Sequence, residues 1–310
     1  MRSLNAVFPG AVDTAPEPPG KAVDMRSELR LSYLETNGVS LHVAQAGPPD
    51  GKPVVLLHGF PEFWYGWRHQ IDQLAEAGFL VIAPDQRGYN RSDRPAGVGS
   101  YDLDLLAKDI IGLADRLGHW RFHIVGHDWG ATVGWWLASH YPERVERFVA
   151  LSAPHPSVWR QAMRTIPEQR RRSRYVQVLR IPWLPELLMR RRNFKVLVDA
   201  LRETMRPGAV SEADLDLYRA AWSARGALTG MVNWYRALML RADRALDAAP
   251  VQVRTLVIWG DRDRFGVPAL AERSAALCSA AELVRLDASH WTQHDEPERV
   301  NALLLEFLGQ

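Results

Sequence analysis

The sequence predicts an α/β fold in which a mostly parallel β-sheet carries helices on both faces and a helical segment interrupts the succession of strands. In the first half of the chain, short β-rich runs alternate with stretches of helical period, the alternation that builds a covered parallel sheet. Two further β-rich runs appear only after residue 250. Residues 154–248, which separate the two groups, have no comparable β-rich run and are rich in arginine, leucine and tryptophan.

The expected strands follow the β-rich runs in chain order. They are residues 39–44, 53–57, 80–83, 122–125, 145–151, 255–259 and 282–286. Helical spacing of apolar residues predicts helices over residues 67–77 and 103–117. Because α/β enzymes bind their ligands at the carboxyl ends of the strands, we expect the helical segment inserted after residue 153 to form a lid over that edge.

The chain is therefore expected to have three parts. Residues 1–24 hold prolines, glycines and acids without the apolar run of about 7 residues that a signal peptide needs, so they are expected to be a flexible extension. Met25 is a second candidate for the start of the protein. Residues 25–153 and 249–310 are expected to form the α/β core, and residues 154–248 the helical cap.

Composition and charge argue against several classes of function. The formal net charge is only +2, so we expect the local arginine runs to be solvated helix faces and expect no nucleic-acid partner. No uncharged apolar run approaches the roughly 18 residues of a membrane span, and no membrane partner is expected. The only cysteine, Cys278, excludes an internal disulfide and every multi-cysteine metal site. We expect a cytoplasmic protein without a metal or other cofactor.

The chain is organised around the residues from Gly126 to Gly130, Gly-His-Asp-Trp-Gly, which follow an apolar run and precede small residues at helical spacing. This is the layout of a nucleophile elbow, a tight strand-to-helix turn that exposes one side chain. The side chain at the apex is Asp128, whose carboxylate is ionised at neutral pH and can attack carbon without a base. Aspartate is also a favoured helix cap, but the flanking glycines favour the elbow.

A carboxylate that has formed an alkyl ester needs a base to activate water, and the base needs a partner that fixes its tautomer. Two aspartates, Asp261 and Asp263, follow the run at 255–259, and His290 follows the run at 282–286. Either aspartate is also an ordinary turn residue. Position after the last strand favours His290 as the base over the other histidines considered, which are His58, His127 and His294.

A loop that follows the run at 53–57 is expected to supply a backbone donor. It begins His58-Gly59-Phe60-Pro61, and a loop in this place can direct a backbone N–H at the oxygen of a tetrahedral intermediate. The residue after the nucleophile supplies a second N–H. The expected oxyanion-hole donors are therefore Phe60 and Trp129.

These motifs together resemble the α/β-hydrolase-fold epoxide hydrolases, and the resemblance covers residues 34–308. It rests on the residues from His58 to Trp64, from Asp85 to Asn90, from Gly126 to Gly130, from Asn233 to Arg236 and from His290 to Gln293. The resemblance implies an eight-stranded, mostly parallel sheet with an inserted helical cap. It also implies Asp263 as the orienting acid, because Asp263 ends the Gly-x-x-Asp pattern where this family carries that acid.

In that family, two tyrosines of the cap hydrogen-bond the epoxide oxygen and help to protonate the leaving alkoxide. The resemblance places the second of them on Tyr235. The first commonly lies seven residues before a proline, which gives Tyr175 before Pro182, although Val178-Leu179-Arg180 departs from the aromatics and glutamine common after the first tyrosine. Tyr218 is the alternative. The chemical need is for an acid of pKa near 10 in a dry pocket.

The resemblance implies that the protein hydrolyses a small apolar epoxide to a vicinal diol through an ester on Asp128. A haloalkane or haloacid dehalogenase is the first alternative, because haloalkane dehalogenases resemble the chain in nucleophile, following tryptophan and base. Trp129 would then serve as one halide donor, and a cap indole would add the second; the candidates for the second are Trp159, Trp183 and Trp222. Phe60, however, stands where many haloalkane dehalogenases carry asparagine. A non-catalytic receptor on the same fold is the second alternative, and a homodimer is an open possibility for the assembly.

Overall fold

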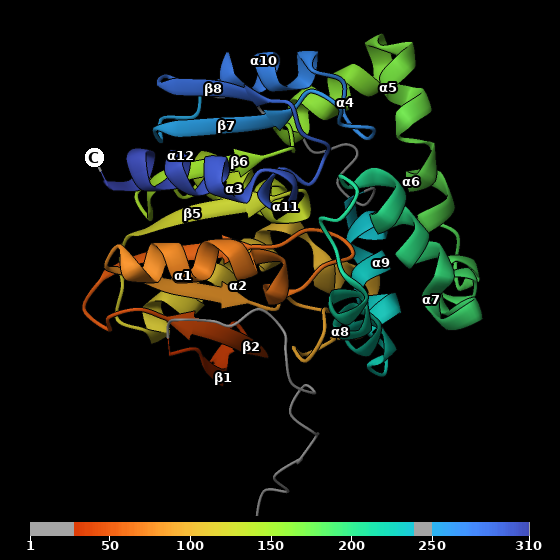
Figure 1. The fold of residues 1–310 in the computed structure, drawn as a ribbon, viewed down its shortest axis with the longest axis horizontal. Helices are drawn as coiled ribbons and strands as arrows, with labels where there is room; N and C mark the ends of the chain where they lie inside the picture. Colours follow the sequence, from red (N-terminus) through yellow and green to blue (C-terminus); the bar gives the residue numbers. More distant parts are fainter. Residues whose placement is uncertain (1–27, 239–249, 310) are drawn as a thin grey trace, which may run out of the picture.

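The fold is built on an eight-stranded sheet with helices packed against both faces (Figure 1). The structure, a computed structural model, describes residues 28–238 and 250–309. The strand order is β1-β2-β4-β3-β5-β6-β7-β8; β1 and β2 pair antiparallel, as do β2 and β4, and all other neighbours pair parallel. The strands are β1 (Arg30–Thr36), β2 (Val39–Ala46), β3 (Lys52–Leu57), β4 (Phe79–Pro84), β5 (Phe122–His127), β6 (Val145–Leu151), β7 (Thr255–Gly260) and β8 (Ala281–Leu286).

All seven predicted runs form strands, and the predicted α/β class with a mostly parallel sheet is confirmed. The eighth strand, β1, is not among those runs. Its side chains alternate between more and less exposed positions at the edge of the sheet, so it has no continuous apolar stretch. Asn37 and Gly38 have φ of 45° and 75° and connect β1 to β2. Asn-Gly between two strands is the sequence signal for such a hairpin.

Alternate residues of the central strands enter two different cores. On β3, Val55 and Leu57 belong to one core, whereas Val54 and Leu56 belong to the other. Apolar residues on both faces of a strand are typical of a parallel sheet covered on both sides. The helices of the core are η1 (Trp64–Trp67), α1 (Arg68–Glu76), η2 (Val98–Tyr101), α2 (Leu103–Arg116), α3 (Trp129–His140), α10 (Ala269–Ala275), α11 (Thr292–Asp295) and α12 (Pro297–Gly309).

Among the described residues, six further helices lie between β6 and β7 in the sequence, and we call them the inserted helices. They are α4 (Pro156–Thr165), α5 (Pro167–Arg172), α6 (Arg174–Leu179), α7 (Leu184–Thr204), α8 (Glu212–Ser223) and α9 (Ala227–Leu238). Figure 1 shows them beside the ends toward which β5 and β7 point. The expected extension at 1–24 and the expected end of the cap at 248 lie outside the described residues.

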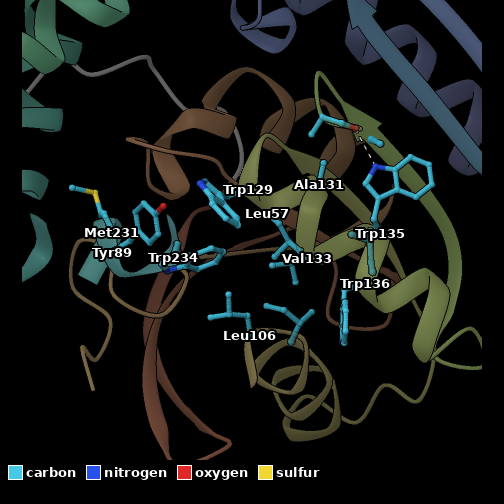
Figure 2. Close-up of a cluster of buried hydrophobic side chains, with 14 of the residues drawn as sticks. Leu57, Tyr89, Leu106, Trp129, Ala131, Val133, Trp135, Trp136, Met231 and Trp234 are labelled. Carbon is cyan, nitrogen blue, oxygen red and sulfur yellow. Dashed lines mark hydrogen bonds between the residues drawn. The ribbon is translucent and has the colours of Figure 1, made fainter. Parts of the chain in front are cut away.

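The first of the two cores joins α3 to the inserted helix α9 (Figure 2). The indole rings of Trp129 and Trp234 meet at a centroid distance of 5.7 Å. On the other side of α3, the Trp135 indole N–H donates a hydrogen bond to Ala153 O at 3.0 Å, drawn as a dashed line in Figure 2. Buried aromatic pairs of this kind combine a large apolar area with defined geometry. The helix after Asp128 is therefore fixed against both the sheet and α9.

The loop after β4 holds α9 in place. A Cβ atom at Gly230 would overlap the backbone of Gly88, so the helix and the loop are in direct backbone contact. The Trp234 indole N–H donates to Arg87 O at 2.9 Å. Arg87 is itself fixed by Asp109, to which its Nε and Nη2 donate at 2.8 and 2.5 Å. The sequence from Asp85 to Asn90 thus positions an inserted helix on the core.

In the part of the chain that the structure describes, the longest and most apolar helices still fall short of what a bilayer crossing requires.

The buried Arg87–Asp109 pair predicts a large loss of stability when it is broken. Burial raises the pKa of Asp109, and the Arg87 guanidinium offsets part of that rise. Replacing Asp109 with alanine leaves the Arg87 charge buried without its partner, so we expect the free energy of unfolding in urea to fall by about 3 to 5 kcal/mol. Asp199→Ala, which breaks the exposed pair with Lys195, is the control and should cost less than about 1 kcal/mol. Similar losses in both variants would contradict the role given to the buried pair.

Candidate active site

Asp128 lies at the junction of β5 and α3, where the sequence predicts the apex of the elbow. Its backbone φ is 50°, in the left-handed region, a conformation that costs a non-glycine residue about 1 to 3 kcal/mol. The turn is possible because the residues two positions before and after Asp128 are glycines: a Cβ at Gly130 would overlap Leu57 O, and one at Gly126 would lie 2.5 Å from Ala131 N. The Asp128 side chain makes no capping hydrogen bond to α3. The helix-cap interpretation therefore does not describe this residue.

The structure brings Asp128, His290 and Asp263 together in one row. His290 Nε2 lies 3.6 Å from Asp128 Oδ2, and His290 Nδ1 lies 2.9 Å from Asp263 Oδ2. The other oxygen of Asp263 accepts hydrogen bonds from Phe265 N at 2.6 Å and Gly266 N at 3.0 Å. Asp261 instead pairs with Arg285 at 2.6 Å, where both side chains are exposed. Of the two aspartates, Asp263 is the one in contact with His290.

The charges in this row stabilise one another. Burial by itself disfavours the protonated imidazole, but the charge of Asp263 and hydrogen bonding with Asp128 together raise the pKa of His290 to about 10. Burial likewise opposes ionisation of Asp128, and hydrogen bonding and charge interaction with His290 outweigh it, so the pKa of Asp128 is lowered. At neutral pH the site therefore holds a carboxylate facing an imidazolium.

The oxygen of Asp128 that faces away from His290 is held by the core loop. Phe60 N donates to Asp128 Oδ1 at 2.9 Å, and a Cβ at Gly59 would overlap the Asp128 side chain. Phe60 therefore lies where the sequence expects a backbone donor. Trp129 is the first residue of α3, and in residues 28–238 and 250–309 its amide has no hydrogen bond to the Asp128 side chain; its role as a second donor stays a prediction.

Tyr175 and Tyr235 line the same cavity as Asp128 and His290, which has a volume of about 320 Å³. The two phenol rings come from α6 and α9 and meet at a centroid distance of 6.2 Å. Tyr218, the alternative to Tyr175, does not line this cavity. It is fully buried, and its hydroxyl donates to Glu62 Oε1 at 2.7 Å. The structure therefore places Tyr175 beside Tyr235, and Tyr218 in a different environment.

Both cavity tyrosines are held in the neutral form. Burial raises the pKa of Tyr175 and Tyr235, and the nearby Asp128 charge adds to the rise. The Trp129 side chain is hydrogen-bonded to Tyr235 and offsets part of this rise, and the two rings meet edge-on at a centroid distance of 5.0 Å. At neutral pH, where the Asp128 carboxylate is ionised, the neutral phenols can donate hydrogen bonds into the cavity.

The three cap tryptophans that the sequence offers as halide donors lie in different places. Trp159 lines the cavity. Trp183 has 71% of its surface exposed, and the Trp222 indole N–H donates to Pro61 O at 2.6 Å. The Trp129 indole is bonded to Tyr235. Only Trp159 of the three, within the described residues, is placed to meet a ligand beside Asp128.

Sequence reasoning missed a buried polar cluster beneath the site. Glu62 Oε1 accepts from Tyr218 and from His294 Nε2, each at 2.7 Å. His127 links this cluster to the base, because its Nδ1 lies 3.3 Å from Glu62 Oε2 and its Nε2 lies 3.0 Å from His290 O. Burial would raise the pKa of Glu62, but His294 and His127 hold it well below its usual range. The signal in the sequence is Glu62 itself, an acid that directly follows the His-Gly-Phe-Pro loop.

The remaining histidine considered, His58, is also structural in its contacts. His58 Nδ1 lies 3.0 Å from Gly59 O, and its Nε2 accepts from Gln86 N at 3.1 Å. Burial lowers the pKa of His58, so the ring is neutral and connects the loop after β3 to the loop after β4. Among the described residues, no group of three or more histidines, cysteines and acids is arranged to hold a metal ion.

Comparisons with known proteins agree with this geometry. Residues 52–297 match the family model described as alpha/beta hydrolase fold. The AB hydrolase superfamily protein YfhM of Bacillus subtilis (strain 168) is 43% identical over 281 residues, covering 90% of this chain and 98% of that protein. Epoxide hydrolase 4 of Homo sapiens is 35% identical over 285 residues, covering 89% and 78% of the two chains.

A crystal structure of an epoxide hydrolase from Bacillus megaterium in complex with an inhibitor superposes with a TM-score of 0.82 at 32% identity, covering 90% of this chain and 100% of that chain. Both the sequence matches and the structural match extend over the core and the inserted helices. The chain belongs to the α/β-hydrolase-fold family and, within it, to the epoxide hydrolases.

Proposed function

We propose that the protein hydrolyses an epoxide to a vicinal diol through a covalent ester on Asp128. The observation that carries this proposal is that a nucleophile and two neutral phenols line one cavity, with His290 beside the nucleophile. An epoxide oxygen leaves as an alkoxide, which is a poor leaving group unless an acid meets it. The phenols of Tyr175 and Tyr235 are such acids, and the inserted helices that carry them act as the cap of the site.

The first step joins substrate and protein. Asp128 Oδ1 is occupied by the Phe60 amide, so Oδ2 is the oxygen that attacks an epoxide carbon. The C–O bond of the ring breaks on the opposite side, and a phenol of Tyr175 or Tyr235 gives its proton to the alkoxide. The products of this step are an ester of Asp128 and a tyrosinate. Holding nucleophile and acids in one cavity removes much of the entropic barrier to this reaction.

The second step needs His290 as a base, and the first step prepares it. In the free protein Asp128 helps to keep the pKa of His290 near 10. Esterification removes that negative charge, so the pKa of His290 falls and its proton can return to the tyrosinate. The neutral imidazole then takes a proton from water, and the resulting hydroxide attacks the ester carbonyl. Phe60 N is placed to stabilise the charge that develops on Oδ1.

Collapse of the tetrahedral intermediate expels the alkoxide of the diol, which takes the proton held by His290 and leaves Asp128 as a neutral carboxylic acid. Asp128 then gives its proton to the neutral His290, which restores the carboxylate and the imidazolium. The net reaction consumes one water and one epoxide and regenerates both residues. Apolar side chains form much of the cavity wall, among them Trp159, Met163, Val176, Leu238 and Leu270. This apolar part of the wall supports a small apolar epoxide as the substrate, because apolar side chains bind apolar substituents.

We expect the tyrosine pair to separate epoxide hydrolysis from dehalogenation. The wild type should convert styrene oxide to its diol and release no bromide from 1-bromobutane above the rate without protein. Tyr235→Phe removes the acid and should lower diol formation by about 10²-fold or more. Tyr141→Phe, which removes a hydroxyl that bonds to Asp104 and does not line the cavity, is the matched control and should keep near wild-type turnover in the folded fraction. Bromide release, or equal losses in the two variants, would contradict the acid role of Tyr235.

The charge coupling of His290 and Asp128 predicts a measurable pKa shift. Asp128→Asn removes one carboxylate partner, as esterification would, so the pKa of His290 should fall from about 10 by about 1 to 3 units. Because the folded-state pKa is raised, this pairing stabilises the fold below the unfolded pKa of about 6.5, and that stability is lost as the pH rises through about 10. NMR titration of the His290 ring measures the shift, with Asp261→Asn as the control; an unchanged pKa in Asp128→Asn would contradict the coupling.

A further inference from the structure

Exposed apolar side chains gather on one part of the inserted helices. Of the large hydrophobic side chains that are exposed among the described residues, most come from the stretch between α6 and the middle of α7. We call five of them the α6–α7 patch: Val178, Ile181, Trp183, Leu187 and Leu188. Trp183 is 71% exposed and its backbone φ is 55°. An apolar cluster of this kind on a surface marks an interaction site more often than scattered single residues do.

Arginines are interspersed with the residues of the patch and follow them in the sequence. Residues 174–192 contain five arginines and one acid. The acid, Glu186, is occupied by Arg236, whose Nη1 and Nη2 donate to it at 2.8 and 3.0 Å. In the part of the chain described, none of the five forms an ion pair with an acid; they are Arg174, Arg180, Arg190, Arg191 and Arg192. The surface therefore combines exposed apolar side chains with arginines to which the described residues offer no partner carboxylate, although the net charge of the whole chain is only +2.

The patch lies on the outer side of the inserted helices and next to the wall of the cavity. Figure 1 shows α6 and α7 on the side of the inserted helices that faces away from the sheet, with α9 between α7 and the sheet. Tyr175, Val176 and Gln177 of α6 line the cavity, and Val178 of the same helix belongs to the patch. The helix α6 therefore contributes both to the wall of the cavity and to the patch.

We propose that the α6–α7 patch docks onto the surface of an anionic lipid bilayer. Tryptophan and leucine enter the boundary between headgroups and acyl chains, while the arginines meet the lipid phosphates. Each cation near an anionic surface contributes to attraction, and four to eight of them are typical of segments that bind acidic lipids. The charge of the surface thus selects an anionic partner, and its apolar side chains select one with an apolar interior.

A second copy of this chain fits the same surface less well. A two-fold dimer would place the patch of one copy against the patch of the other. The arginines of both copies would then face each other without acids to separate them, which is repulsive. A bilayer with acidic headgroups has no such conflict.

Docking would also place the cavity beside the apolar interior of the bilayer, in which apolar epoxides concentrate. That consequence rests on the proposed epoxide hydrolysis, but the docking itself does not, and it can be measured with no substrate present. Failure of one proposal therefore leaves the other open to its own test.

The test is sedimentation of the full-length protein with large unilamellar vesicles. We expect the protein to bind vesicles of phosphatidylcholine with about 30% phosphatidylglycerol at low salt, and to bind at least about tenfold more weakly to pure phosphatidylcholine or in 0.5 M NaCl. Two variants should each weaken binding to the acidic vesicles at least about tenfold. One replaces Arg190, Arg191 and Arg192 together by glutamine, and the other combines Trp183→Ala with Leu187→Ala.

Matched controls remove the same groups elsewhere. The first control replaces three exposed arginines together by glutamine, which causes the same change in net charge; they are Arg91, Arg116 and Arg299. The second, Trp120→Ala, removes a tryptophan that is 65% exposed. Both controls should bind acidic vesicles like the wild type, and thermal unfolding checks that every variant is folded. The proposal is overturned if the wild type does not bind acidic vesicles, or if the controls lose as much binding as the patch variants. Self-association that Trp183→Ala abolishes, without vesicle binding, would overturn it in favour of a dimer.

Discussion

The buried charge of Asp128 is the constraint on which the rest of the site depends. A carboxylate at the end of a parallel sheet is costly unless its charge is matched. Here a backbone N–H holds one oxygen and an imidazolium faces the other. The same two contacts fix the carboxylate in space, so the groups that make the charge tolerable also aim it into the cavity. Asp263 and the Glu62 cluster act one step further away, because they hold the His290 side chain and its backbone.

The inserted helices and the core are connected through adjacent residues of α9. Trp234 points into the first core, where it contacts Trp129 and bonds to Arg87 O, whereas its neighbour Tyr235 lines the cavity. The position of a phenol above the nucleophile is therefore set by packing that lies outside the cavity. This explains why the loop from Asp85 to Asn90, which contributes no group to the proposed chemistry, is needed to build the site.

Local patterns in the sequence predicted most of the fold and part of the site. Apolar runs identify the buried parallel strands, and the glycines around Asp128 identify a turn that no other residue type allows. The edge strand β1 was not predicted, because only one of its faces is buried and it therefore has no continuous apolar run. The choice between Tyr175 and Tyr218 depends on a pair of tyrosines 60 positions apart, and the cluster around Glu62 depends on contacts across 156 and 232 positions. No local pattern records such contacts.

The central claim is that Asp128 forms an ester with the substrate, and the mass of a variant protein tests it most directly. His290→Gln removes the base that hydrolyses the ester while leaving the nucleophile in place. Mixed with styrene oxide, this variant should gain the mass of one substrate, with the adduct on the peptide that contains Asp128, and the double variant with Asp128→Asn should gain none. An unmodified His290→Gln protein, or an adduct elsewhere in the chain, would contradict the account.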